Sequence, residues 1–145
     1  MQDYPHRYLA TADAPEAGPI DVSSPGLEKL VSAAPAEFDG PGDLWSPETM
    51  LVGSVANCFI LTFRAVARGS RFEWNALRCE VEGVLNRVDR VTRFTDFNIR
   101  AILRVPEGTD EHKAQRLLEK SEAVCLVTNT LNSELHLTTE IIYEP

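Results

Sequence analysis

The sequence predicts a mixed α+β fold in a single domain. One long apolar helix, one amphipathic helix and several alternating strands follow one another along the chain, and this order is typical of that class. The chain has 145 residues, of which 43% are hydrophobic, so it is long enough to bury one core of its own. We therefore expect one domain over residues 1–145, without an internal repeat.

The first third of the chain is expected to form short strands. Residues 6–12, 20–23 and 27–32 are rich in strand-forming residues and are separated by segments that carry proline and glycine. A Ser-Pro-Gly sequence at 24–26 is a β-turn signal between the second and third of these strands. Residues 33–45 carry two prolines and two glycines, which predicts an ordered loop or a lid.

A long helix is predicted from Ser46 to about Arg68. Ser46 can cap free backbone N–H groups, Pro47 is tolerated at the first helical position, and Glu48 is favoured at the positive end of the dipole. The helix is apolar almost all round, so we expect its surroundings to enclose it. Its apolar run at 50–63 is shorter than the roughly 20 residues that span a bilayer. We interpret it as a buried helix.

Two long strands, a second helix and a closing strand are predicted in the second half. Apolar and polar residues alternate over 77–85 and over 97–105, and a turn near residues 89–90 would pair these strands antiparallel. Thr109 can cap the second helix. The residues on one face of that helix are Ala114, Leu117, Leu118 and Ser121. Alternation returns over residues 135–143, which predicts the last strand.

Composition and charge exclude several classes of function. The chain has 22 acidic and 14 basic residues, a formal charge of −8, and no cluster of lysines and arginines. Neither nucleic acid nor an anionic membrane surface is therefore an expected partner. The first residues lack the basic and apolar segments of a secretory signal, so we expect a cytoplasmic protein. The three cysteines are too widely spaced for a disulfide framework or a C-x-x-C motif.

Sequence templates for metal sites and for common nucleophiles find no match. His6, His112 and His136 stand at no ligand spacing, and the chain contains no H-E-x-x-H, G-x-S-x-G, P-loop or G-x-G-x-x-G motif. We interpret His112 as a solvated helix residue and His136 as a residue on the polar face of a strand. No metal and no cofactor are therefore expected.

Each of the three cysteines can be explained by packing alone. Cys79 is in phase with the apolar residues of its strand, so we expect it in the core without a further role. Cys58 lies in the most apolar helix, and Cys125 continues the apolar stripe of the second helix. However, residues 126–131 could begin a new helical turn, whose dipole would lower the pKa of the Cys125 thiol. Peroxide chemistry uses such a thiolate together with a second, resolving thiol.

Two motifs make the sequence similar to the OsmC/Ohr family of organic hydroperoxide reductases. The run WSPETMLVGSVANCF at 45–59 resembles a family motif in which Pro-Glu opens a central helix and the reactive cysteine precedes Phe. The run CLVTNTL from Cys125 resembles the second cysteine motif, and the segments at 26–27 and 35–45 also match. The resemblance implies an OsmC/Ohr-like fold, with antiparallel sheets around a long central apolar helix, in an intertwined homodimer.

The resemblance also implies a thiol-dependent peroxidase with two cysteines. Cys58 would be the peroxidatic cysteine, Cys125 the resolving cysteine, and Glu48 the acid that helps hold an arginine of the site. An organic hydroperoxide would be the substrate, a dithiol of the dihydrolipoyl type the reductant, and the two sites would lie at the dimer interface. Glu48 stands ten residues before Cys58, about 15 Å along a straight helix. Either the helix breaks around Gly53, or Glu48 acts by another route or serves only the helix dipole.

Two features depart from the family pattern. Family members carry an arginine in one of two loops, whereas the matching segments here, residues 12–19 and 33–45, contain none. The arginines that could substitute are Arg7, Arg64 and Arg100. If no arginine approaches Cys58, burial in an apolar helix should raise the pKa of its thiol. The second departure is Leu126, which stands where the family usually has proline.

Three functions are compatible with these features. The first is the thiol peroxidase. The second is a non-catalytic OsmC-like dimer that binds an apolar small molecule in an interface pocket beside Cys58, lined by residues such as Phe38, Trp45 and Phe59. In the third, the cysteines of a stress-related dimer merely pack. A depressed pKa of Cys58 would favour the enzyme, and an inert thiol would favour binding or packing.

Overall fold

The computed structural model describes all residues from Met1 to Pro145, and they form two compact units, Met1–Met50 and Leu51–Pro145. The first unit contains a three-stranded antiparallel sheet in the order β1-β2-β3. Its strands are β1 (Thr11–Asp13), β2 (Ile20–Ser23) and β3 (Leu30–Ser32). The prediction of a single domain over residues 1–145 stays a prediction.

Two of these three strands differ from the sequence-based expectation. β2 has the predicted bounds, but β1 begins only at Thr11. Thr11 pairs with Ser23, the last residue of β2, so the residues before Thr11 have no partner on that strand. β3 is shorter than expected, because the turn that precedes it includes Leu27, whose N–H donates to the carbonyl of Ser24 at 3.1 Å. The β-prone residues outside the strands lack a pairing partner, and pairing is what makes a strand.

The segment at 33–45 is an ordered loop, as predicted. It contains a short 3₁₀ helix, η1 (Ala36–Phe38), and its two ends are joined by a hydrogen bond of 3.0 Å from the Ala33 N–H to the Trp45 carbonyl. A side chain at Gly40 would collide with the carbonyl of Ala34, so the glycine permits a close approach of backbone to backbone.

The long helix α1 (Pro47–Gly69) starts and ends within one residue of its predicted bounds. The Ser46 hydroxyl accepts the Thr49 N–H at 3.1 Å, and the Thr49 hydroxyl accepts the Ser46 N–H at 2.8 Å. Each side chain thus provides an acceptor for the other residue's backbone N–H at the start of the helix. With 23 residues, α1 is longer than the apolar run in its sequence. By length and composition alone it could cross a membrane, a criterion that core helices of soluble proteins also meet.

The second unit contains a sheet in the order β4-β5-β6. Its strands are β4 (Ala76–Val88), β5 (Val91–Pro106) and β6 (Glu134–Glu144). β4 and β5 pair antiparallel around a two-residue turn in which Asp89 and Arg90 have φ values of 50° and 66°. β5 and β6 pair parallel, so the expectation of antiparallel sheets was wrong for this pair. Helices between the two strands carry the chain back to the starting end of β5, which allows parallel pairing.

Two helices form the connection between β5 and β6. They are α2 (Glu111–Val124) and α3 (Leu126–Asn129). The N-cap of α2 is Asp110 and not Thr109, because the Asp110 carboxylate accepts the N–H groups of His112 and Lys113 at 2.9 and 3.3 Å. The four residues predicted for the apolar face of α2 are the four that the structure buries.

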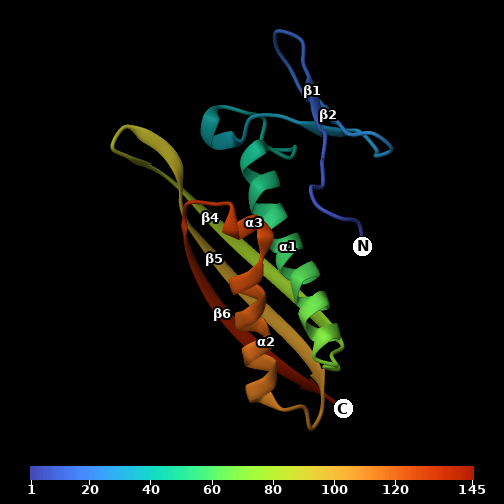
Figure 1. Cartoon of the computed structure of the whole chain (residues 1–145). Helices are drawn as coiled ribbons and strands as arrows, with labels where there is room; N and C mark the ends of the chain where they lie inside the picture. The colour runs from blue at the N-terminus through green and yellow to red at the C-terminus, as the bar shows by residue number, and fades with distance from the viewer. The chain divides into compact units, whose positions relative to one another are not determined.

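The core of the second unit lies between the sheet and the helices α1 and α2, which cover one face of it (Figure 1). Its fully buried large side chains include Val55, Phe59, Phe63, Phe97, Ile99, Leu103, Val105 and Leu118. A Cβ atom on Gly83 of β4 would lie 2.7 Å from Val52 of α1, so the sheet and this helix are in tight contact. Only one side of α1 is fully buried, however, and Leu61 is 53% exposed. One chain therefore covers only one side of α1, and the expectation that its surroundings enclose it stays a prediction.

Candidate active site

Two free cysteines from separate elements meet in the second unit. Cys58 lies in the middle of α1, where the Thr62 hydroxyl donates to its carbonyl at 2.7 Å and lies 3.8 Å from its sulfur. Cys125 lies at the junction of α2 and α3, in extended backbone that ends one helix and begins the next. The two thiols lie close enough for each to shift the pKa of the other. The pairing of these two residues in the reaction, which the family resemblance implies, stays a prediction.

The two thiols differ in exposure and in acidity. Cys125 is only 1% exposed, and its burial would raise the pKa of the thiol. That effect is outweighed by the polar groups around the sulfur, which together lower the pKa of Cys125. They are the backbone N–H of Thr128, the Cys58 thiol, the Thr128 hydroxyl and the backbone of Val127. The helical turn expected after Cys125 is α3, so the expected lowering of this pKa is confirmed.

Cys58 shows the opposite shift. Its thiol is partly buried, and desolvation is the largest of the effects that raise its pKa. A backbone hydrogen bond from Val127 and the Thr62 hydroxyl oppose this shift, while the neighbouring Cys125 thiol adds to it. No lysine, arginine or histidine of the second unit contributes to this shift of the Cys58 pKa. Cys125 is therefore the more acidic of the two thiols, and Cys58 the less acidic.

The two threonines of the site were not found by sequence reasoning. Thr62 follows Cys58 by four residues and Thr128 follows Cys125 by three, so in each case the threonine lies one helical turn further along. Both hydroxyls also bond to the carbonyl of the cysteine that they follow, at 2.7 and 3.2 Å. A threonine three or four residues after a cysteine is a local sequence signal, and it could have indicated both threonines.

Cys79 is the third cysteine, and it lies on β4, paired with Ala101 of β5. Burial raises the pKa of its thiol to about 12, with smaller contributions from Cys125 and Glu80. The side chain packs against the core, as expected. A thiol with this pKa is protonated at neutral pH and is a poor nucleophile.

Comparison with known proteins identifies the family. A family model described as OsmC-like protein matches residues 40–140 of the chain, a region that includes both Cys58 and Cys125. The chain belongs to the OsmC-like protein family. It is also 30% identical, over 114 residues, to the uncharacterized protein YmaD of Bacillus subtilis (strain 168), and the match covers 73% of each protein.

Solved structures of OsmC-like proteins share the fold of this chain. An OsmC-like protein of unknown function from Vibrio cholerae superposes with a TM-score of 0.83 at 16% identity, over 95% of this chain and 100% of that one. An organic hydroperoxide resistance protein from Elizabethkingia anophelis superposes with a TM-score of 0.80 at 19% identity, over 96% and 99%. These similarities confirm the predicted OsmC/Ohr-like fold with two sheets and a central helix.

Glu48, the third residue that the family resemblance indicates, lies in the first turn of α1. The helix runs through Gly53 without a break, so the suggestion that it breaks there was wrong, and a helical rise of about 15 Å separates the backbones of Glu48 and Cys58. One oxygen of the Glu48 carboxylate, Oε2, is buried and has no hydrogen-bond partner. A buried carboxylate oxygen requires a donor, so Glu48 remains a predicted holder of a cation.

The arginine that OsmC/Ohr sites use has no counterpart beside Cys58 in the second unit. Arg100 lies on the sheet face opposite the helices and forms ion pairs with Glu80 and Glu140, at 3.6 and 3.0 Å. Arg64 is exposed on α1. Arg7 is exposed in the first unit, before β1. The raised pKa of Cys58 is the result that we expect for a thiol without such a cation.

The residues expected to line an apolar pocket do not share one environment. Phe59 is 1% exposed and belongs to the core of the second unit, so its side chain does not line an open pocket. Phe38 and Trp45 are exposed side chains of the first unit. The exposed apolar side chains of the second unit include Leu61, Val124 and Leu126, of which Leu126 is 70% exposed.

Proposed function

We propose that this protein is a thiol peroxidase that reduces organic hydroperoxides through Cys58 and Cys125. The observation that carries the proposal is the pair of free, neighbouring thiols, one partly exposed and the other buried at backbone N–H groups. Membership of the OsmC-like family supports it, as does the structural similarity to a protein named for organic hydroperoxide resistance. Neither Cys79 nor a metal is needed for this chemistry.

The nucleophile of the proposed reaction is the thiolate of Cys58. Loss of the Cys58 proton to water leaves this thiolate on the more exposed residue of the pair. That thiolate attacks the O–O bond, forming a sulfenic acid on Cys58 and releasing an alkoxide, which takes a proton from water. The Cys125 sulfur then attacks the sulfenic sulfur, and the hydroxyl group leaves with the Cys125 proton as water. The resulting disulfide is reduced by an external dithiol, for which we propose the dihydrolipoyl type.

We also propose that the active form is a homodimer with two sites at the interface. The side of α1 that the chain itself does not bury carries the exposed Leu61, and the exposed Leu126 directly follows Cys125. Apolar side chains that stay exposed in one chain are typical of a surface that a partner covers. Light scattering at low micromolar concentration is expected to give the mass of two chains, whereas a well-folded monomer would contradict the dimer.

Peptide mapping after reaction with cumene hydroperoxide tests the proposed function. At one equivalent per chain we expect a single disulfide, between Cys58 and Cys125, because these thiols are close enough for each to shift the pKa of the other. Cys79 is expected to stay free, since its buried thiol, with a pKa of about 12, is protonated at neutral pH. A bridge that includes Cys79, or three free thiols after the reaction, would contradict the proposal.

The second candidate function is the binding of an apolar small molecule without turnover. Two observations favour it: the raised pKa of Cys58, and the exposed apolar side chains Leu61 and Leu126 of the second unit. It predicts that cumene hydroperoxide leaves all three thiols free, while an apolar dye binds saturably. Formation of the Cys58 to Cys125 disulfide would instead favour the enzyme.

A further inference from the structure

Three side chains with metal-binding groups lie together on the sheet face opposite the helices, on the far side of the sheet from the cysteine pair. Asp96 belongs to β5, and Glu134 and His136 belong to β6. The parallel register places Asp96 beside Glu134 and places His136 one step further along the same face. Because side chains alternate between the two faces of a strand, all three point away from the core.

The ligand atoms of this cluster converge on one point. His136 Nε2 lies 3.0 Å from Asp96 Oδ1 and 3.9 Å from Glu134 Oε2, and the three ligand atoms all lie within 4.8 Å of one another. A divalent ion with bonds of about 2.0 to 2.2 Å requires its ligand atoms to lie within about 4.4 Å of each other. The side chains of His136 and Glu134 are 50% and 79% exposed, so small rotations suffice to reach that spacing.

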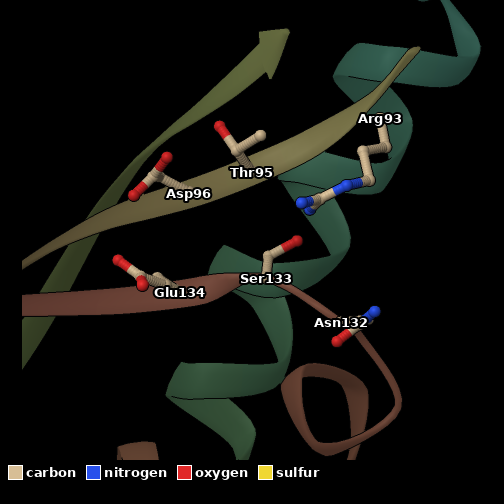
Figure 2. Close-up of a pocket in the computed structure, with 6 residues that line it drawn as sticks. All are labelled: Arg93, Thr95, Asp96, Asn132, Ser133 and Glu134. Carbon is tan, nitrogen blue, oxygen red and sulfur yellow. The ribbon is translucent and has the colours of Figure 1, made fainter. Parts of the chain in front are cut away.

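The charges of the cluster favour a cation. Two carboxylates stand at paired positions of neighbouring strands, an arrangement that favours a positive group between them. The His136 ring, hydrogen-bonded to Asp96 at 3.0 Å, is the protein group that now faces both carboxylates. Figure 2 shows both carboxylate groups beside each other at the edge of a pocket, with the Arg93 side chain on the other side of it. The Arg93 guanidinium donates to the carbonyl of Phe94 at 3.4 Å and makes no ion pair with either carboxylate.

A pocket beside the cluster leaves room for further ligands of an ion. It has a volume of about 450 Å³. Its lining residues are Arg93, Thr95, Asp96, Asn132, Ser133 and Glu134. Two of the three candidate ligands therefore face an open, polar space that water can enter. Three protein ligands with open coordination positions are typical of sites that exchange water or a small ligand.

We propose that Asp96, Glu134 and His136 form a binding site for a divalent transition-metal ion. One imidazole nitrogen and two carboxylate oxygens are a mixed set that suits Mn²⁺, Fe²⁺, Co²⁺ or Zn²⁺, whereas Mg²⁺ and Ca²⁺ prefer oxygen ligands alone. The remaining positions of the ion face the pocket and are filled by water. This site does not depend on the proposed peroxidase, which uses other residues on the other side of the sheet.

The sequence expectation of no metal site followed from the spacing of the histidines along the chain. His136 is 40 residues from Asp96, and no motif connects them. Only the pairing of β6 with β5 brings these two residues and Glu134 together. Parallel strand pairing thus forms a ligand set that has no signature in the sequence.

Titration with Co²⁺ alone, followed by visible absorption and by calorimetry, tests the site. We expect one ion per chain with weak d–d bands and no sulfur-to-cobalt charge-transfer band, because the ligands are nitrogen and oxygen. Zn²⁺ is expected to displace the cobalt. The variants His136→Gln and Asp96→Asn are each expected to bind at least about tenfold more weakly, as for loss of one metal ligand.

Two controls show whether the ion binds at this cluster or elsewhere on the protein. His112→Gln removes a second exposed histidine that lies on α2, outside the cluster, and is expected to leave the affinity unchanged. Thermal unfolding without metal is expected to be the same in all three variants, because the replaced side chains are on the surface. Three outcomes would overturn the proposal: no binding of Co²⁺, binding that survives both His136→Gln and Asp96→Asn, or a sulfur-to-cobalt band that disappears in Cys58→Ser.

Discussion

Replacement of Cys58 by serine is expected to lower the rate of organic hydroperoxide reduction at least about 10³-fold, as for removal of an essential nucleophile. Cys58 is the more exposed member of the thiol pair, and serine in its place forms no thiolate to attack the O–O bond. The measurement is the consumption of cumene hydroperoxide in the presence of a dithiol. Cys79→Ser is the matched control, because Cys79 is a core thiol with a pKa of about 12, and its replacement is expected to leave the rate unchanged.

Replacement of Cys125 by serine separates the two roles in the same assay. Cys58 can still be oxidised in this variant, but no second thiol is present to resolve the sulfenic acid. We expect each chain to consume one hydroperoxide rapidly and to accumulate a sulfenic acid that dimedone traps on Cys58. If Cys58→Ser retains most of the activity while Cys125→Ser abolishes the first oxidation, the assignment of the two roles is reversed.

The rate of the first oxidation step is expected to rise about tenfold for each pH unit between about pH 6 and pH 8. Burial raises the pKa of Cys58, so its thiol is protonated over this whole range. Below the pKa of a thiol, the thiolate fraction increases about tenfold per pH unit, and the rate of thiolate attack increases with it. Stopped-flow oxidation of the reduced protein measures this step without a contribution from the reductant.

A rate that stays constant over this pH range would contradict the prediction, because it would require a Cys58 thiolate that is already formed at its acidic end. Such a thiolate needs a cation that the second unit does not supply. In that case the variant Arg7→Met tests whether Arg7 is the cation. A lower oxidation rate with an unchanged oligomeric state by light scattering would identify Arg7, and an unchanged rate would exclude it. The oxidation rate of the wild-type protein at the same pH is the reference for this comparison.

Most of the local structure could be predicted because its causes lie within a few residues. Ser46 and Pro47 start α1 through one cap and one favourable backbone angle, and alternation alone located β4, β5 and β6. The α2 face was also predicted in full. The predicted ends of elements were wrong by one to several residues where neighbouring residues could each mark the end. Thr109 and Asp110, for example, can both cap the start of α2, and Asp110 is the N-cap.

The family and the two cysteines followed from motifs that the sequence carries in short, continuous runs. Cys58 and Cys125 were singled out in this way, and the pKa of Cys58 was expected to be raised because no nearby segment offers an arginine. Hydrogen bonding at the start of α3 is local as well, so the lowered pKa of Cys125 could also be anticipated from the residues that follow it.

The contacts between distant residues were decided only by the tertiary structure. Cys58 and Cys125 stand 67 positions apart, and they are neighbours because α1 and α2 pack on the same face of one sheet. The parallel pairing of β6 with β5, which also unites Asp96 with His136, depends on the chain returning through α2 and α3. Periodicity and capping act over a few residues, whereas the direction and register of such a pair are chosen by how the whole core is buried.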